Sequence, residues 1–213
     1  MKTFIIEGNY PSYNIPALFP FDKNGDEANP ALPCAMVCVP DTTHTLRGKP
    51  FFIPDGIEEC RVQLHVAVRI SRLGRHIAAR FAGRYYDALT LCATFTDAAL
   101  LRRLREAGLP WELSKGFDGS VCVGSFAGPE VLHATGEGGT FRLNLNGGEV
   151  QCGNVADMLC DVEHVIAAVS SCYKLCDGDL ILCGTPSEGV PVQINSRVEA
   201  TLGGEKLLQF NVK

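Results

Sequence analysis

The chain has 213 residues, 46% of them hydrophobic, with a formal net charge of −5 and a pI of about 5.5. This length and composition allow one substantial buried core and exclude an extensively disordered or fibrous protein. The acidic balance lacks the basic footprint that a phosphate backbone requires, so we expect no nucleic acid partner.

The chain contains no signal of export or membrane insertion. Its apolar stretches fall short of the roughly 20 residues of a membrane span, and residues 1–10 are too polar for a signal peptide. We therefore expect a cytoplasmic protein with no membrane partner. Ten scattered cysteines then fit reduced thiols, most of them small buried hydrophobes. The spacings Cys34/Cys38 and Cys172/Cys176 leave open helical metal or redox pairs.

The first part of the chain alternates short strand signals with proline-rich sequence. Residues 3–7 (TFIIE) predict a strand that ends at Gly8. Residues 11–33 contain five prolines together with Asn, Asp and Gly, which is typical of a long loop or lid. Residues 35–39 predict a short apolar strand, and residues 49–54 are a further strand candidate.

The clearest strand signal is the alternation in residues 61–70 (RVQLHVAVRI). One face of this strand would carry Val62, Leu64, Val66 and Val68. The opposite face would carry Arg61, Gln63, His65, Ala67 and Arg69.

Two segments predict short amphipathic helices. Residues 97–108 have leucines at helical spacing, Asp97 suited to the amino-terminal end, and Gly108 where the helix should stop. Residues 162–172 place apolar side chains on one helical face, and Asp161 can cap this helix.

The remaining signals complete a mixed, mainly β protein with a few short peripheral helices. Asn146-Gly147 between strand-like runs predicts a hairpin, and residues 178–213 indicate strands joined by glycine-rich turns. We expect residues 1–48 to form an amino-terminal strand with a proline-rich lid, and residues 49–213 to form one compact domain.

Several phrases, in this order, resemble the carboxy-terminal domain of the fumarylacetoacetate hydrolase family. They are Gly8-Asn9-Tyr10, GLPWELSKGFD at 108–118, LNGGEVQCGNVADM at 145–158 and GDLILCGTPSEGV at 178–190. The sequence is most similar to the short acylpyruvase/oxaloacetate decarboxylase and hydroxyhepta-dienedioate isomerase branch. The resemblance implies a β-roll fold, a homodimer, and hydrolysis, decarboxylation or isomerisation of small oxo acids.

The resemblance also implies a Mg²⁺ or Mn²⁺ site, held by a Glu-x-Glu pair on one strand and an Asp on a later strand. These positions fall on Arg61, Gln63 and Thr94, so all three carboxylates are missing. A hard divalent cation needs oxygen ligands, usually carboxylates, and we therefore expect no metal cofactor. The exchange of three carboxylates for Arg, Gln and Thr predicts a cationic pocket.

Other functional positions of the family are changed as well. The His and Glu of the lid fall on Tyr13 and Pro16, and the substrate-clamping Arg falls on Ala98. Neither Tyr13 nor Pro16 can act as an acid or base near neutral pH as His does. Lys115 is retained at the position of the family's lysine, and Gly184-Thr185 at its carboxylate-binding turn.

The candidate ligand-binding residues form two groups. One group stands at the positions of the missing metal ligands, and the other at positions where the family contacts its substrate. They are Arg61, Gln63, Thr94, Lys115, Gly184 and Thr185, and Lys115 is also the candidate catalytic residue.

Each candidate has an alternative interpretation. Arg61 could instead pair with Asp118 or Glu59, and His65 could be a satisfied core histidine rather than an acid/base. A slip in alignment could bring Glu58, Glu59 or Asp97 to the metal as carboxylates.

Three functions remain open from the sequence. The preferred one is a diverged family member that has lost its metal-dependent activity and binds at most a small carboxylate. The second is an enzyme that still acts on an acylpyruvate-like oxo acid, with displaced metal ligands or with Lys115 and Arg61 as electrostatic stabilisers. The third is a non-catalytic dimerisation or interaction subunit.

Overall fold

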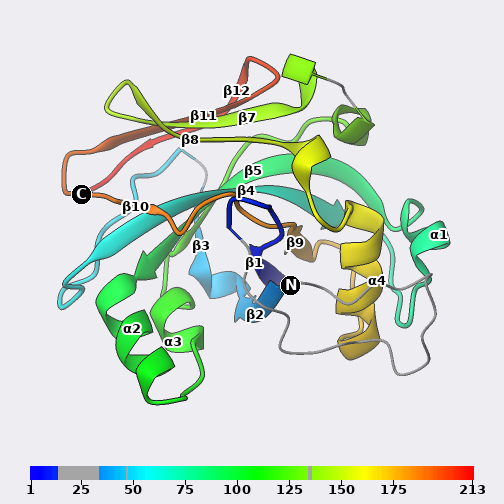
Figure 1. The fold of residues 1–213 in the computed structure, drawn as a ribbon, viewed down its shortest axis with the longest axis horizontal. Coiled ribbons are helices and arrows are strands. Elements are labelled where there is room, and N and C mark those ends of the chain that lie inside the picture. Colours follow the sequence, from blue (N-terminus) through cyan, green and yellow to red (C-terminus); the bar gives the residue numbers. More distant parts are fainter. Residues whose placement is uncertain (14–33, 47, 134–135) are drawn as a thin grey trace.

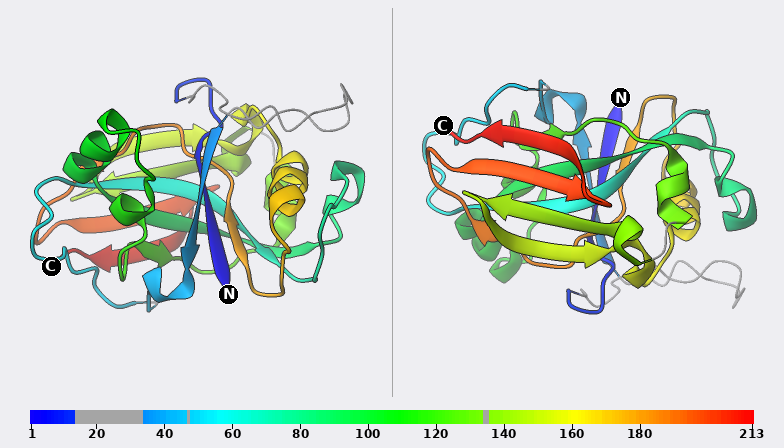
Figure 2. Two further views of the ribbon diagram at one scale, coloured as in Figure 1. Left: turned by 90° about the horizontal axis from the view of Figure 1, so that it is seen from below. Right: turned by 90° about the horizontal axis from the view of Figure 1, so that it is seen from above.

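The computed structural model describes residues 1–13, 34–46, 48–133 and 136–213. Two β-sheets lie face to face, and short helices flank the larger one (Figure 1). Strands dominate and the larger sheet is strongly curled, which confirms the predicted mainly β class with peripheral helices (Figure 2). Within the described ranges, the helices are too short or too polar to cross a lipid bilayer.

The larger sheet collects strands from nearly the whole chain. In spatial order it contains β2 (Cys34–Pro40), β1 (Lys2–Gly8), β9 (Leu180–Leu182), β4 (Cys60–Ile70), β5 (Tyr86–Asp97), β6 (Val121–Val123) and β3 (His44–Thr45), and β10 (Val190–Pro191) also pairs with β4. The β1–β9 and β3–β6 pairs are parallel and the others are antiparallel. The predicted strands at 3–7, 35–39 and 61–70 are therefore confirmed.

The smaller sheet is antiparallel and consists of two hairpins. Its order is β12 (Glu205–Asn211), β11 (Arg197–Leu202), β7 (Thr140–Leu145) and β8 (Gly148–Asn154). One hairpin is formed by β7 and β8 and the other by β11 and β12, and pairing of β7 with β11 joins them. Asn146 and Gly147 join β7 to β8 with φ of 54° and 86°, the left-handed values that a tight hairpin turn demands of both central residues. The predicted hairpin and the carboxy-terminal strands are confirmed.

Both predicted helices are confirmed, and each begins directly after its predicted capping residue. The carboxylate of Asp97 accepts from the backbone N–H of Leu100 at the start of α2 (Ala98–Glu106), and that of Asp161 does the same for His164 in α4 (Val162–Cys172). The remaining short helices are α1 (Ala79–Ala82), α3 (Glu112–Lys115), and the 3-10 turns η1 (Asp41–Thr43), η2 (Pro129–His133), η3 (Gly136–Gly139) and η4 (Val155–Asp157).

Strand β4 divides two environments by its alternation. Val62, Leu64 and Val66 lie in a core between the sheets, and Val68 lies in a second core beneath α4. The opposite face carries Gln63, His65 and Ala67, and α2 and α3 lie on this side of the larger sheet (Figure 1). The face that carries Gln63 and His65 is also buried, so these two polar side chains are enclosed by protein rather than exposed to solvent.

One predicted strand is wrong, and one alternative that the cysteine spacing left open is excluded. Residues 49–54 do not form a strand: only Phe51 bridges to Val212, because the prolines at 50 and 54 cannot donate ladder hydrogen bonds. Cys34 and Cys38 lie on strand β2, and Cys172 ends α4 with Cys176 beyond it, so neither pair shares a helix face. Pro16 and most of the predicted lid lie outside the described residues.

The Gly8-Asn9-Tyr10 phrase is joined to the 183–185 turn by close backbone packing. Asn9 has φ of 74°, and its buried amide donates to the carbonyls of Cys160 and Cys183 and accepts from the Cys160 N–H. A Cβ on Gly184 would come within 2.4 Å of the Gly8 carbonyl oxygen. Glycine is therefore required at 184, and this crossing fixes the end of β1 beside β9.

We expect Asn9→Ala to lower the free energy of unfolding by about 3 kcal/mol or more, because three buried polar groups lose their partner. Asn195→Ala is the matched control, since exposed Asn195 has a similar φ of 71° and loses only its left-handed tolerance. Urea denaturation of both variants measures the difference. Equal losses would show that backbone strain, not the hydrogen bonds, dominates at Asn9.

Candidate functional site

A buried polar centre lies on the face of the larger sheet that is turned toward α2 and α3. Gln63 and His65 come from β4, and Thr94 comes from β5, where the register places Gln63 directly opposite Thr94. Glu7 enters from β1 and Lys115 from the end of α3. The structure thus brings together three of the predicted site residues, Gln63, Thr94 and Lys115, and adds Glu7.

Lys115 is the hub of this centre. Its ammonium lies 2.8 Å from Glu7 Oε1, 2.9 Å from Thr96 Oγ1 and 3.3 Å from Gln63 Oε1. The Lys115 and Glu7 side chains are only 2% and 1% exposed. Such a buried pair is tolerable only when each charge is balanced and the remaining hydrogen-bonding capacity is satisfied.

Glu7 supplies the negative charge of the centre. Burial acts to raise the pKa of its carboxyl, but the Lys115 ammonium, His65 and hydrogen bonds from Lys115 and Gln63 outweigh burial and lower the pKa overall. Glu7 therefore remains a carboxylate at neutral pH. Tyr13 donates to Glu7 Oε2 at 3.4 Å, and burial followed by the Glu7 charge raises the pKa of the Tyr13 phenol, which keeps it protonated.

His65 is the second titratable group of the centre and contacts Thr94. Its Nε2 lies 3.0 Å from Thr94 Oγ1, with the side chain completely buried. Burial lowers the pKa of His65 to about 4, the nearby Glu7 opposes that shift, and Lys115 adds to it. His65 is therefore neutral near pH 7. This favours a hydrogen-bonded core histidine over an acid/base.

Arg61 lies at the edge of the centre and pairs there with a carboxylate. Its Nε donates to Glu59 Oε1 at 2.7 Å, and Glu59 also accepts from Arg102 at 2.8 Å. Of the alternatives for Arg61, the structure thus has the Glu59 pair. Glu7 balances Lys115, whereas the single Glu59 carboxylate is shared by Arg61 and Arg102 and leaves one net positive charge at this edge. The expected cationic pocket stays a prediction. Asp97 caps α2, so Asp97 and Glu59 both have partners of their own.

Gly184 and Thr185 lie beside the centre rather than against Lys115. Thr185 is buried, its N–H donates to the Gly8 carbonyl, and its hydroxyl accepts from Gln151 at 3.3 Å. Gln151 also bonds both backbone groups of Leu64. Gln63 reaches the same loop by donating to the Ser187 carbonyl at 2.9 Å. The ligand-binding roles predicted for Gly184 and Thr185 stay predictions.

Sequence reasoning did not identify Glu7, Thr96 and Gln151. A signal for Glu7 existed, because it is the one charged residue of the strand 3–7 and shares a strand face with Thr3 and Ile5. Thr96 follows Thr94 at strand spacing on the same face of β5. Gln151 had no local signal, since its partners lie on β4 and in the 185–187 turn.

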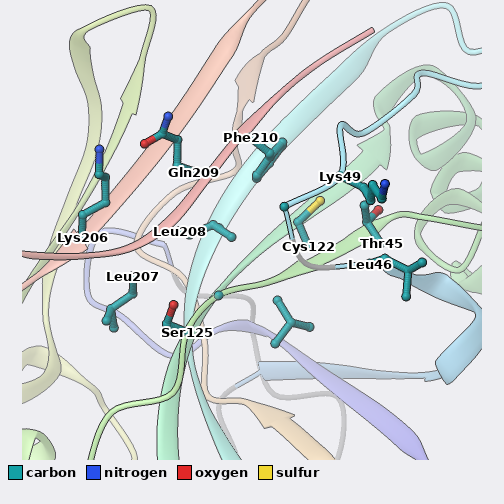
Figure 3. Close-up of a pocket in the computed structure, with 13 residues that line it drawn as sticks. Thr45, Leu46, Lys49, Cys122, Ser125, Lys206, Leu207, Leu208, Gln209 and Phe210 are labelled. Carbon is teal, nitrogen blue, oxygen red and sulfur yellow. The ribbon is translucent and has the colours of Figure 1, made fainter.

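A pocket of about 220 Å³ opens away from this centre, between the β3–β6 edge of the larger sheet and strand β12 of the smaller one (Figure 3). Cys122 lies in its wall, and burial raises the pKa of this thiol to about 12. The two lysines of the lining are Lys49 and Lys206, and Lys206 pairs with Glu199 at 3.1 Å. The candidate residues of the buried centre do not line this pocket.

Comparison with known proteins agrees with this fold and with the order of the motifs. Residues 18–212 match the family model described as fumarylacetoacetate (FAA) hydrolase, C-terminal. The chain therefore belongs to the fumarylacetoacetate hydrolase family.

Two relatives show which branch the sequence is similar to. The chain is 29% identical to the mitochondrial oxaloacetate tautomerase FAHD1 of Mus musculus over 177 residues, which cover 82% of this chain and 78% of the relative. It is 30% identical to the oxaloacetate tautomerase YcgM of Escherichia coli (strain K12) over 173 residues, or 79% and 77% of the two chains.

Solved structures share the fold at lower identity. Fumarylpyruvate hydrolase from Pseudomonas aeruginosa, in complex with Mn²⁺ and pyruvate, superposes with a TM-score of 0.82 at 20% identity, covering 100% of this chain and 89% of that one. The 2-hydroxyhepta-2,4-diene-1,7-dioate isomerase from Mycobacterium marinum gives 0.78 at 21% identity, covering 99% and 73%. These likenesses establish the fold alone.

The donor set at the positions that the resemblance assigns to the metal does not fit a hard divalent cation. Arg61 offers a guanidinium, Gln63 an amide and Thr94 a hydroxyl, and the amide oxygen of Gln63 already accepts from the Lys115 ammonium. A search of the described residues finds no group of three His, Cys, Asp or Glu suited to a metal. The expectation of no metal cofactor stays a prediction.

We expect a double-mutant cycle to show strong coupling between Glu7 and Lys115. Lys115→Met leaves a buried unpaired carboxylate and should cost about 3–5 kcal/mol of unfolding free energy, whereas Glu7→Gln/Lys115→Met should cost much less than the sum of its single changes. Urea denaturation measures the cycle. The exposed Arg69–Asp87 pair is the control and should couple by less than about 1 kcal/mol. Similar coupling in both pairs would contradict the buried-pair account.

Acid should destabilise the protein through His65. Its pKa is about 4 in the folded chain and roughly 6.5 when unfolded, so the unfolded state binds more protons as the pH falls between these values. This contribution is full above about pH 6.5 and declines by about 1.4 kcal/mol per pH unit toward pH 4. His65→Asn should flatten the slope, and His164→Asn on the surface of α4 should not. Unfolding free energies at several pH values test this.

Proposed function

We propose that this chain is a fumarylacetoacetate hydrolase family protein without the family's metal-dependent oxo-acid activity, and that it binds at most a small carboxylate. The observation that carries this proposal is the position of the Lys115 ammonium, which contacts Gln63 and Thr96 and pairs with Glu7. By the family resemblance, Gln63 stands where a metal carboxylate would be. A lysine ammonium is thus the cation of the centre.

Charge balance supports this interpretation. Three carboxylates, one divalent cation and one lysine would together be neutral. Glu7 and Lys115, with Gln63, Thr94 and neutral His65, are neutral as well. Adding a divalent cation to the present set would leave two uncompensated positive charges among side chains that are almost fully buried, which is strongly unfavourable.

Catalysis without metal by Lys115 and Arg61 is less well supported. That role requires free positive charge aimed at a substrate, whereas each of these cations already has a carboxylate partner at 2.7–2.8 Å. The relatives named as oxaloacetate tautomerases and hydrolases therefore suggest where the pocket came from and which ligands it takes, namely small oxo acids. They do not suggest that the reaction is retained. A homodimer and a cytoplasmic location remain part of the proposal.

The test is calorimetric titration with Mg²⁺ and Mn²⁺, each with and without oxalate, which mimics an enolate held by a metal. We expect no saturable metal binding by the native chain. A variant with restored carboxylates and no internal anion, Arg61→Glu/Gln63→Glu/Thr94→Asp/Glu7→Gln, should bind one Mn²⁺ per chain because the metal then neutralises the centre.

Two results would contradict the proposal. Saturable Mn²⁺ binding by the native chain that Gln63→Ala abolishes would mean that the present donor set does hold a metal. Failure of the folded, carboxylate-restored variant to bind Mn²⁺ would mean that Arg61, Gln63 and Thr94 do not stand at the metal positions. Folding of each variant is checked by circular dichroism and thermal unfolding.

A further inference from the structure

Glu7 is placed by strand pairing rather than by any motif of the family resemblance. It is the last residue but one of β1, on the inward face that also carries Thr3 and Ile5. On one side β1 pairs with β2, where Glu7 lies opposite Ala35, and on the other it pairs with β9. The carboxylate is therefore delivered to the centre by a strand held on both sides.

The surroundings of the Lys115 ammonium show where an external ligand could bind. A lysine ammonium has three N–H donors and no acceptor. Three oxygens surround it within 3.3 Å, namely Glu7 Oε1, Thr96 Oγ1 and Gln63 Oε1. Only one of these is charged, and it is the one that an incoming carboxylate could replace with the same chemistry.

We propose that Glu7 is a built-in carboxylate ligand that occupies the anion-binding position of Lys115, so that a small monocarboxylate binds there only when Glu7 is removed or displaced. This inference rests on the proposed function, because it assumes that the centre works without a metal. It names the ligand class of the site, an acetate-like or pyruvate-like monoanion, and the residue that excludes it.

Charge determines the ligand class. With Glu7 in place the centre is neutral, and one more carboxylate would leave an unbalanced buried negative charge. Glu7→Ala opens the space that the carboxylate fills and leaves Lys115 unbalanced, so a monoanion would restore neutrality. A dianion such as oxalate would overshoot by one charge and should bind less well than pyruvate.

The first experiment is calorimetric titration with pyruvate in the presence of a chelator. We expect Glu7→Ala to bind pyruvate at least tenfold more tightly than the native chain, and Glu7→Ala/Lys115→Met to lose that gain. Glu149→Ala is the matched control, because it removes a carboxylate that pairs with Arg142 at 2.7 Å on the surface. That control should bind pyruvate no better than the native chain.

A second experiment does not depend on Glu7→Ala being folded without a ligand. Glu7→Ala leaves space for the missing carboxylate, so acetate should raise its melting temperature in a saturable way, or induce its folding if it is unfolded alone. The same acetate concentrations should leave the native chain and Glu149→Ala unchanged, because neither has the vacated site.

The outcomes separate this inference from the proposed function. A folded Glu7→Ala that gains no affinity for pyruvate and shows no acetate effect would overturn the role of Glu7 and leave the metal-free centre standing. An equal gain in Glu7→Ala/Lys115→Met would also overturn it, since Lys115 would not be the binding group. Pyruvate binding by the native chain that requires Mn²⁺ would overturn the proposed function instead.

Discussion

The ion pair between Glu7 and Lys115 is the constraint on which the candidate site depends. Both side chains are almost completely buried, and an unbalanced charge there would cost several kcal/mol. The neighbouring groups follow from this requirement, because Thr96 and Gln63 satisfy the remaining donors of the ammonium. A buried centre whose charges already balance has little capacity for a further ion.

The surrounding scaffold is that of the fumarylacetoacetate hydrolase family, and the difference lies in a few side chains. The close crossing of Gly8 with Gly184 holds β1 against β9 and so delivers Glu7 to Lys115. Arg61, at a position that the resemblance assigns to a metal carboxylate, pairs at the edge of the centre with Glu59, which Arg102 shares. Because the fold can be kept while the charges change, membership of the family does not by itself establish an activity.

Elements with strong local signals could be predicted from the sequence. The alternation of β4, the capping residues Asp97 and Asp161, and the Asn146-Gly147 turn each act through neighbours in the chain, and each formed where expected. The short elements β3, β6, α1 and α3 could not be predicted, since two to four residues carry no usable periodicity. Their positions are set by the strands and helices they pack against.

The motif spacing predicts that residues 61, 63 and 94 stand at the family's metal positions. Gln63 and Thr94 do lie opposite each other on neighbouring strands, and their assignment to a metal site stays a prediction. The ion pairs of the centre could not be found in the same way. Glu7 has no role in the resemblance and Glu59 is only one of two possible partners of Arg61, because spacing along the chain does not show which charges meet.

The sequence by itself determined the family, the alternation of faces along β4 and the absence of carboxylates at positions 61, 63 and 94. Only the tertiary structure decided which charges meet. Glu7 and Lys115 come from distant parts of the chain and are joined because β1 enters the larger sheet between β2 and β9 while α3 packs against β2 and β5. Local propensity and spacing encode elements, whereas the partner of a buried charge depends on the order in which those elements assemble.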